Sequence, residues 1–252
     1  MVLNNRILIY PIIALILVIL TGSSFRNIDM NNDQTKSNPI SVTETEKDRD
    51  AKVYETVKDR DGNVYETVTI GTQVWMAENL KTTKYRNGEP ITNVLINTSW
   101  AALTTGAYCW YNNDATANKS VYGALYNWFA VTDKRDLAPA GWHIPSNAEW
   151  TTLIKFLNGN NFAGGELKEA LTSHWVSPNF GANNGSGFTA LPGGYRKSDG
   201  VFTYAGYCGG WWTSTEYSKS VAWYRYVDYS SSSVGSTSSF KKCGFSVRCV
   251  KD

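Results

Sequence analysis

The sequence predicts an α+β domain, in which short helices precede an antiparallel β region. Three stretches have helical patterns: residues 122–131, 146–157 and 166–171. After Gly181 the chain becomes rich in Gly, Ser and Tyr, and turn signals separate short strand-like runs. The strand candidates there are GFTAL, GGWWTST, AWYRYVDY and GFSVRCV. Segregation of helices from strands along the chain is typical of the α+β class.

The first 22 residues predict export. Residues 7–20 (ILIYPIIALILVIL) form an uncharged apolar run behind Arg6, which is the pattern of a secretory signal peptide. Because the uncharged run extends to Phe25, an uncleaved membrane anchor is the alternative. The preceding residues resemble the end of a bacterial lipoprotein signal, but Ser23 stands where the lipid-modified cysteine would be. We therefore expect a protein of the periplasm, outer membrane or cell surface, without a lipid at this position.

Two segments of different character separate this region from the main domain. Residues 23–46 are rich in polar side chains without apolar periodicity, which predicts a flexible tether. An internal repeat follows, since residues 47–57 (KDRDAKVYETV) and 58–68 (KDRDGNVYETV) are identical at nine of eleven positions. Two copies are too few for a solenoid, so we interpret the first as a duplicated first-strand unit. The folded domain is expected to cover residues 58–252.

Residues 146–157 carry the clearest helix signals. A proline precedes the pattern Ser146-x-x-Glu149, which predicts a capping box. Apolar residues then recur at helical spacing, and Asn-Gly follows the last of them. These apolar residues are Trp150, Leu153, Ile154 and Leu157.

Composition limits the classes of function. A net charge of +2, from 24 basic and 22 acidic side chains, provides no basic face for nucleic acid. Aromatic residues make up 13% of the chain, and we expect most of them to fill the core. With two histidines and no Cys-x-x-Cys, no zinc site and no cofactor is expected. An even number of exported cysteines favours disulfides, with three connectivities open; they are Cys109, Cys208, Cys243 and Cys249.

Several long strings, in order along the chain, resemble the Fibrobacter succinogenes major paralogous domain of exported Bacteroidetes and Fibrobacter proteins. They begin with DGNVYETVTIGTQVWMAENLKTTKY, AYCWYNND, YGALYNWFAV and APAGWHIPSNAEWTTL. They continue with GFTALPGGYR, WWTSTE, AWYRY and GFSVRCV. The resemblance covers residues 58–252 and implies no particular biochemical role.

A weaker resemblance is to the formylglycine-generating-enzyme branch of the C-type-lectin-like fold. It rests on a small-residue helix with an internal Trp, the string IPSNAEW, a Trp-rich strand and the C-terminal string GFSVR. The resemblance implies two to three helices flanking a small antiparallel sheet, with a long irregular loop region. It also implies two disulfides, Cys109–Cys249 and Cys208–Cys243.

No catalytic arrangement is evident in the sequence, so we do not expect an enzyme. The cysteine pair that the resemblance to formylglycine-generating enzymes would require is absent from residues 212–229. Glu149 near His143 resembles an acid/base pair, but the capping box accounts for the glutamate. Residues 112–114 (Asn-Asn-Asp) offer oxygen ligands for calcium, as any polar turn does, so calcium is possible but not expected.

The recognition surface that the sequence favours lies in residues 222–242. Period-2 alternation would place Tyr and Asp side chains on one strand face, before a run of Ser and Gly. Rigid tyrosines beside adaptable small residues are typical of binding surfaces. The predicted site residues are Trp211, Trp212, Tyr224, Arg225, Tyr226, Asp228 and Tyr229. The sequence thus predicts a non-catalytic binding module for a glycan or protein ligand; the alternative is a structural component of the envelope.

Overall fold

The computed structural model describes residues 55–252. The predicted export segment, the tether and most of the first repeat copy lie outside these residues. Within the described part, no helix is both long enough and apolar enough to cross a membrane.

The described residues form a mostly β structure, so the predicted α+β, C-type-lectin-like fold with a small sheet is wrong. Thirteen strands assemble into sheets of five, five and three strands between residues 55 and 252. The difference arises because many strands are only two to four residues long and carry no period-2 signal. The predicted helix at residues 166–171 is also wrong, since the chain there leaves helix α5.

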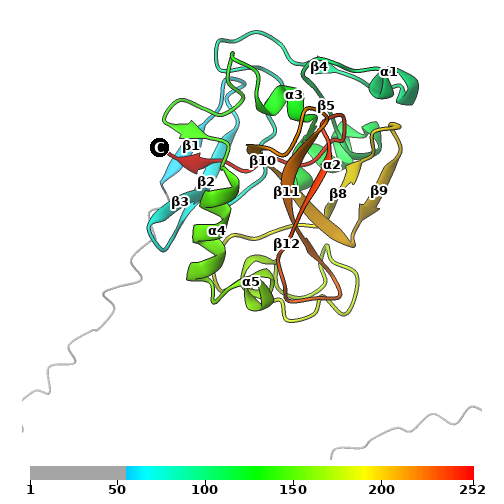
Figure 1. Cartoon of the computed structure of the whole chain (residues 1–252). Helices are drawn as coiled ribbons and strands as arrows, with labels where there is room; N and C mark the ends of the chain where they lie inside the picture. The colour runs from blue at the N-terminus through cyan, green and yellow to red at the C-terminus, as the bar shows by residue number, and fades with distance from the viewer. Residues whose placement is uncertain (1–54) are drawn as a thin grey trace, which may run out of the picture. The chain divides into compact units, whose positions relative to one another are not determined.

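The first sheet joins both ends of the described chain (Figure 1). The end of the first repeat copy forms β1, which pairs antiparallel with β2 of the second copy. Asp59 closes the turn between them, since its carboxylate accepts hydrogen bonds from Asn63 and from the Tyr65 hydroxyl. The sheet has the order β1 (Thr56–Lys58), β2 (Val64–Ile70), β3 (Gln73–Met76), β13 (Val250–Lys251) and β7 (Trp142–His143).

A three-stranded sheet and four short helices lie between residues 92 and 131. The helix predicted at residues 122–131 is wrong for residues 123–127, which include a two-residue strand, because Gly123 adopts a φ of 72° and Asn127 starts a new helix as its N-cap. The strands are β4 (Thr92–Asn93), β5 (Ala107–Cys109) and β6 (Leu125–Tyr126). The helices are α1 (Asn97–Ala101), the 3-10 helix η1 (Tyr111–Asn113), α2 (Ala115–Tyr122) and α3 (Trp128–Val131).

The strongest local prediction is confirmed by helix α4 (Asn147–Phe156). Ser146 Oγ accepts a hydrogen bond from the Glu149 amide at 3.2 Å, and the Glu149 carboxylate accepts one from the Ser146 amide at 2.7 Å. A second helix, α5 (Asn160–Leu167), follows directly.

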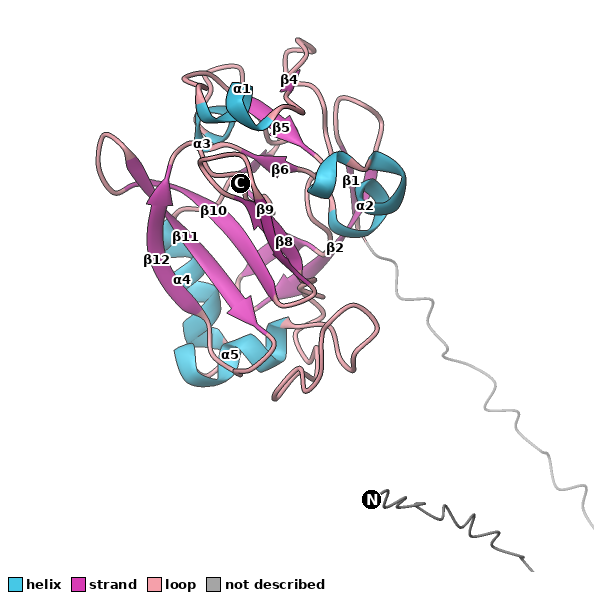
Figure 2. Cartoon of the chain, turned by 90° about the vertical axis from the view of Figure 1, so that its right-hand side faces the viewer, coloured by secondary structure: helices cyan, strands magenta, loops and turns pink. Residues whose placement is uncertain are grey.

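The second five-stranded sheet carries the candidate site. Its order is β12 (Gly235–Phe240), β11 (Val221–Asp228), β10 (Cys208–Glu216), β8 (Gly193–Arg196) and β9 (Phe202–Ala205). Helix α4 lies behind β11 and β12 in Figure 2. Arg225 of β11 donates hydrogen bonds to the side chains of Asn147 and Thr151 in this helix. Strands β10 and β11 confirm two of the four strand predictions for this half of the chain.

Tryptophan dominates the interior, as composition predicts. Nine of the ten tryptophans are buried, and only Trp223 is half-buried. In one cluster the rings of Trp75 and Trp150 lie 5.0 Å apart, with Trp211 6.0 Å from Trp150. Tightly packed aromatic side chains of this size contribute much of a domain's stability.

Candidate functional site

The two faces of β11 have different environments. Arg225 and Val227 are buried on the side of α4, whereas Tyr224, Tyr226 and Asp228 are half-buried on the opposite face. This is the alternation that the sequence predicts. The tyrosine-bearing side is therefore the face of the second sheet on which a ligand could lie.

That face is hollowed by a groove of about 340 Å³, within the range of roughly 300–1,000 Å³ of small-ligand sites. Strands β8 to β11 and the residues that adjoin them supply its lining. We call it the tyrosine groove; its residues are Tyr195, Tyr204, Tyr207, Cys208, Tyr224, Tyr226, Asp228, Tyr229 and Ser230.

Four of these tyrosines form a row of rings together with Phe245. Tyr204 stacks on Tyr195 with ring centroids 5.8 Å apart and planes at 11°, and Tyr195 stacks on Phe245 at 5.0 Å. On its other side Phe245 stacks on Tyr224 at 4.3 Å, and Tyr226 follows at 5.8 Å. The inner rings support one another, so the row is held by packing within the protein.

The backbone determines the positions of the two tyrosines at the ends of this row, Tyr226 and Tyr204. Tyr226 pairs with Gly235 of β12, and a Cβ on that glycine would overlap the tyrosine ring. At the other end Tyr204 has a φ of 64°, which is rare for a bulky residue and costs backbone energy. The Tyr207 amide donates to the Tyr204 carbonyl at 3.0 Å across a turn, so both tyrosines flank the β9–β10 connection. They are 55% and 45% exposed.

The groove has hydroxyl groups but no cation. None of its six tyrosine hydroxyls makes a hydrogen bond to another described residue, and none of the four half-buried rings has its hydroxyl sealed from solvent. Burial raises the pKa of Tyr195 and of Tyr224, so both hydroxyls keep their protons at neutral pH. Asp228 supplies a carboxylate, which accepts hydrogen bonds from the Ser230 amide and hydroxyl.

The structure brings together only part of the predicted site. Trp211 and Trp212 are 1% and 0% exposed and belong to the core, and Arg225 is buried on the opposite face. Tyr224, Tyr226, Asp228 and Tyr229 do line the groove. The prediction missed three tyrosines of β8, β9 and the following turn, which the strings GGYR and FTYAGY could have suggested; they are Tyr195, Tyr204 and Tyr207.

The four cysteines are free thiols in this structure. Cys109 and Cys249 belong to different core clusters, and burial raises the pKa of the Cys109 thiol to about 12. Cys208 lies in the groove, and the Cys243 sulfur accepts a hydrogen bond from Ser239 at 3.3 Å. The disulfides Cys109–Cys249 and Cys208–Cys243 stay a prediction, which would apply to the protein in an oxidising compartment.

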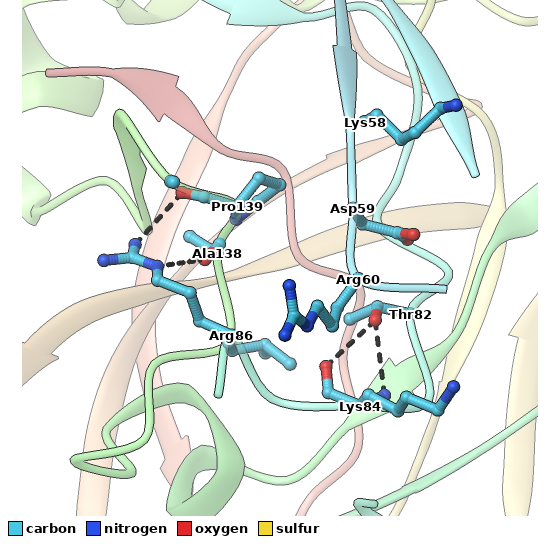
Figure 3. A pocket seen from close by; sticks show the side chains of 10 residues that line it. Lys58, Asp59, Arg60, Thr82, Lys84, Arg86, Ala138 and Pro139 are labelled. Atoms are coloured by element: carbon cyan, nitrogen blue, oxygen red, sulfur yellow. Dashed lines mark hydrogen bonds between the residues drawn. The ribbon is translucent and has the colours of Figure 1, made fainter. Parts of the chain in front are cut away.

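A second, smaller cavity of about 150 Å³ is lined by four cationic residues (Figure 3). The Arg86 guanidinium already makes hydrogen bonds within the protein, because it donates to the carbonyl oxygens of Ala138 at 2.8 Å and Pro139 at 3.0 Å. Lys84 pairs with Asp61 at 3.3 Å. The cavity lies where three segments of the chain meet, namely residues 58–60, 82–86 and 137–140.

Within residues 112–114, where oxygen ligands for calcium are conceivable, Asp114 and the Asn113 amide nitrogen have structural partners, whereas Asn113 Oδ1 is buried without a hydrogen-bond partner among the described residues. Asp114 is the N-cap of α2 and accepts a hydrogen bond from the Ala117 amide at 3.0 Å. The Asn113 side chain donates to the Leu95 carbonyl at 2.9 Å.

His143 lies between two carboxylates. One ring nitrogen is 2.7 Å from Asp252 Oδ1, and the other is 2.6 Å from Glu149 Oε1. Partial burial lowers the pKa of His143, but the hydrogen bonds to the two carboxylates outweigh it, so the pKa is raised above 6.5. Through these two contacts, His143 connects Asp252 to Glu149 in the first turn of α4.

This arrangement predicts a pH-dependent stability. A raised histidine pKa contributes stability that is complete below about pH 6.5 and is lost as pH rises through the folded-state value. His143→Gln should therefore lower the melting temperature more at pH 5.5 than at pH 8.5. Because the histidine side chain is 40% exposed, the effect should stay below about 1 kcal/mol. Calorimetry of the natural sequence and of the variant at both pH values checks this, and equal losses at the two pH values would contradict it.

The comparison with protein families matches residues 68–251 to the Fibrobacter succinogenes major domain. The comparisons with curated proteins and with solved structures give no significant match. The matched region begins within β2, ends at the last residue of β13 and contains the whole tyrosine groove. It confirms the stronger of the two resemblances seen in the sequence, whereas the lectin-like one is not confirmed. The chain belongs to the Fibrobacter succinogenes major domain family.

Proposed function

We propose that this chain is a non-catalytic binding module of the cell envelope, exported by its N-terminal segment, which recognises a glycan or protein ligand in the tyrosine groove. The observation that carries the proposal is a cavity of about 340 Å³ lined by six tyrosines, whose hydroxyls have no hydrogen-bond partner within residues 55–252. A side chain that combines an apolar body with a polar tip is well suited to recognition.

Two further observations support a binding role. Tyr204 keeps a backbone conformation with φ of 64° while its ring remains 55% exposed, so burial does not offset this strain. Such strain is concentrated at functional sites in proteins. Gly235 leaves room for the Tyr226 ring, so the shape of the groove depends on that glycine.

The test is binding of the purified full chain to a mixed array of glycans and peptides. We expect ligands retained by the natural sequence to be lost when Tyr204 and Tyr207 are both replaced by Ala. The melting temperature should change little, since both rings are about half exposed. Tyr217→Ala is the matched control, because this tyrosine is 59% exposed and lies outside the groove.

Two outcomes would contradict the proposal and favour a structural role in the envelope. One is the absence of any ligand on the array. The other is a set of ligands whose binding is unaffected by the double substitution.

A further inference from the structure

We propose that the tyrosine groove binds a neutral glycan, with aromatic rings at its edge contacting the C–H face of a sugar and tyrosine hydroxyls pairing with sugar hydroxyls. This inference rests on the proposed binding function and specifies the chemical class of the ligand. It is argued from the lining chemistry of the groove, from its charge and from the two tyrosines at its edge.

The hydrogen-bonding groups of the groove match a polyhydroxylated ligand. A tyrosine hydroxyl both donates and accepts, as a sugar hydroxyl does. The residues that line the groove carry six such groups, and none of these hydroxyls has a hydrogen-bond partner within residues 55–252. A quaternary ammonium ligand would leave these hydroxyls without partners, and leaving buried polar groups unpaired costs affinity.

The charge of the lining excludes the common anionic ligands. Asp228 is the one charged side chain among the nine lining residues, and the groove contains no Lys, Arg or His. The Cys208 thiol is also neutral, because burial raises its pKa to about 12. Uronic acids, sulfated sugars and phosphates would meet a carboxylate without a counter-charge, so a neutral glycan fits best.

The edge of the groove offers the aromatic faces. Tyr195 has both of its faces covered, by Tyr204 at 5.8 Å and by Phe245 at 5.0 Å. The outer ring of this row, Tyr204, is 55% exposed, and Tyr207 on the same turn is 45% exposed. Tyr207 is itself supported edge-to-face by Tyr229 at 5.3 Å. Two supported but accessible rings are therefore available for a sugar ring.

The experiment is calorimetric titration of the full chain with uncharged hexasaccharides of glucose, xylose and mannose. An oligogalacturonate of the same length and choline serve as charged probes. We expect at least one neutral hexasaccharide to bind and neither charged probe to do so. Tyr204→Ala with Tyr207→Ala should weaken the dissociation constant at least tenfold, which corresponds to about 1.4 kcal/mol.

Further variants separate recognition from stability. Tyr204→Gly should lose affinity without a fall in melting temperature, because glycine adopts a positive φ without strain. Tyr226→Phe removes one hydroxyl, and Gly235→Ala displaces the Tyr226 ring; both should weaken binding while Tyr217→Ala leaves it unchanged.

Each other result overturns the inference in a distinguishable way. Binding of choline or of the galacturonate instead of the neutral sugars would replace the glycan with a charged ligand. Binding of a peptide from the mixed array, lost in the groove variants, would leave the proposed binding function standing and remove the glycan. If no glycan and no peptide binds, both proposals fail.

Discussion

Trp150→Ala should reduce the free energy of unfolding by about 3–5 kcal/mol, the usual cost of truncating a buried tryptophan. The Trp150 side chain is 1% exposed and contacts three other buried rings. Its centroid distances are 5.0 Å to Trp75, 5.7 Å to Phe188 and 6.0 Å to Trp211. The substitution would leave a cavity between α4 and the sheets, which the rigid neighbouring rings cannot fill. Urea denaturation followed by circular dichroism measures the loss.

Two control variants make this expectation specific. Trp150→Phe keeps an aromatic ring and removes an indole N–H that has no acceptor among the described residues, so it should cost much less than the alanine substitution. Trp223→Ala truncates the one half-buried tryptophan, which packs against exposed Tyr217, and should also cost less. Equal losses in Trp150→Ala and Trp223→Ala would show that the aromatic cluster is not the main source of stability.

Helix α4 could be predicted from the sequence because its signals are local. The capping box needs only Ser146 and Glu149, and the apolar spacing needs only the next two turns. The alternation in β11 could be predicted for the same reason. Such signals depend on residues within about ten positions of one another, so they do not depend on the tertiary fold.

The fold class could not be predicted in this way. Strands such as β4, β6, β7 and β13 have two residues each, and their pairing depends on segments far away in the chain. Val250 of β13, for example, pairs with Trp75 on one side and His143 on the other. Two residues carry no periodic pattern, so these segments are interpreted as loops and the β content is underestimated.

The sequence predicts the groove residues of β11 but not those of β8 and β9, because the row of rings is assembled from three distant segments. Tyr224 and Tyr226 lie on β11, Tyr195 and Tyr204 on β8 and β9, and Phe245 near the C-terminus. Nothing in the string GFSVRCV indicates that its phenylalanine lies between two tyrosines. The sequence predicts Trp211 and Trp212 of β10 as binding residues. In the structure they point to opposite faces of the sheet, and each belongs to a different core cluster.

One of the strings that carry the family resemblance, GFSVRCV, is structural. GFSVRCV contributes Phe245, Val247 and Cys249 to the core, and its arginine, Arg248, is 1% exposed. Arg248 donates hydrogen bonds to Asn79 and to the Phe188 and Thr189 carbonyls. The buried residues of this string therefore stabilise the fold, whereas the strings GFTALPGGYR and AWYRY also supply Tyr195, Tyr224 and Tyr226 to the groove.

A second buried arginine provides the other large expected effect. The guanidinium of Arg196 lies 4.4 Å from the centroid of the Trp100 ring and 4.6 Å from that of Phe202, and the residue is fully buried. It donates four hydrogen bonds, which join β8 to the segment before α1 and to the β8–β9 turn. The acceptors are the carbonyl oxygens of Val94, Leu95 and Gly200 and the side chain of Asn97.

Arg196→Met should therefore lower the free energy of unfolding by at least about 3 kcal/mol, since hydrogen bonds to a charged group contribute roughly 1.5–3 kcal/mol each and are not additive. Methionine keeps much of the volume, but the Val94 and Gly200 carbonyls lose the only donor that residues 55–252 offer them. Arg60→Met is the matched control, because Arg60 is exposed and makes no hydrogen bond or ion pair with another described residue. Denaturation of both variants in parallel gives the comparison. A loss in Arg196→Met no larger than that in Arg60→Met would mean that the buried guanidinium is replaceable by apolar packing alone.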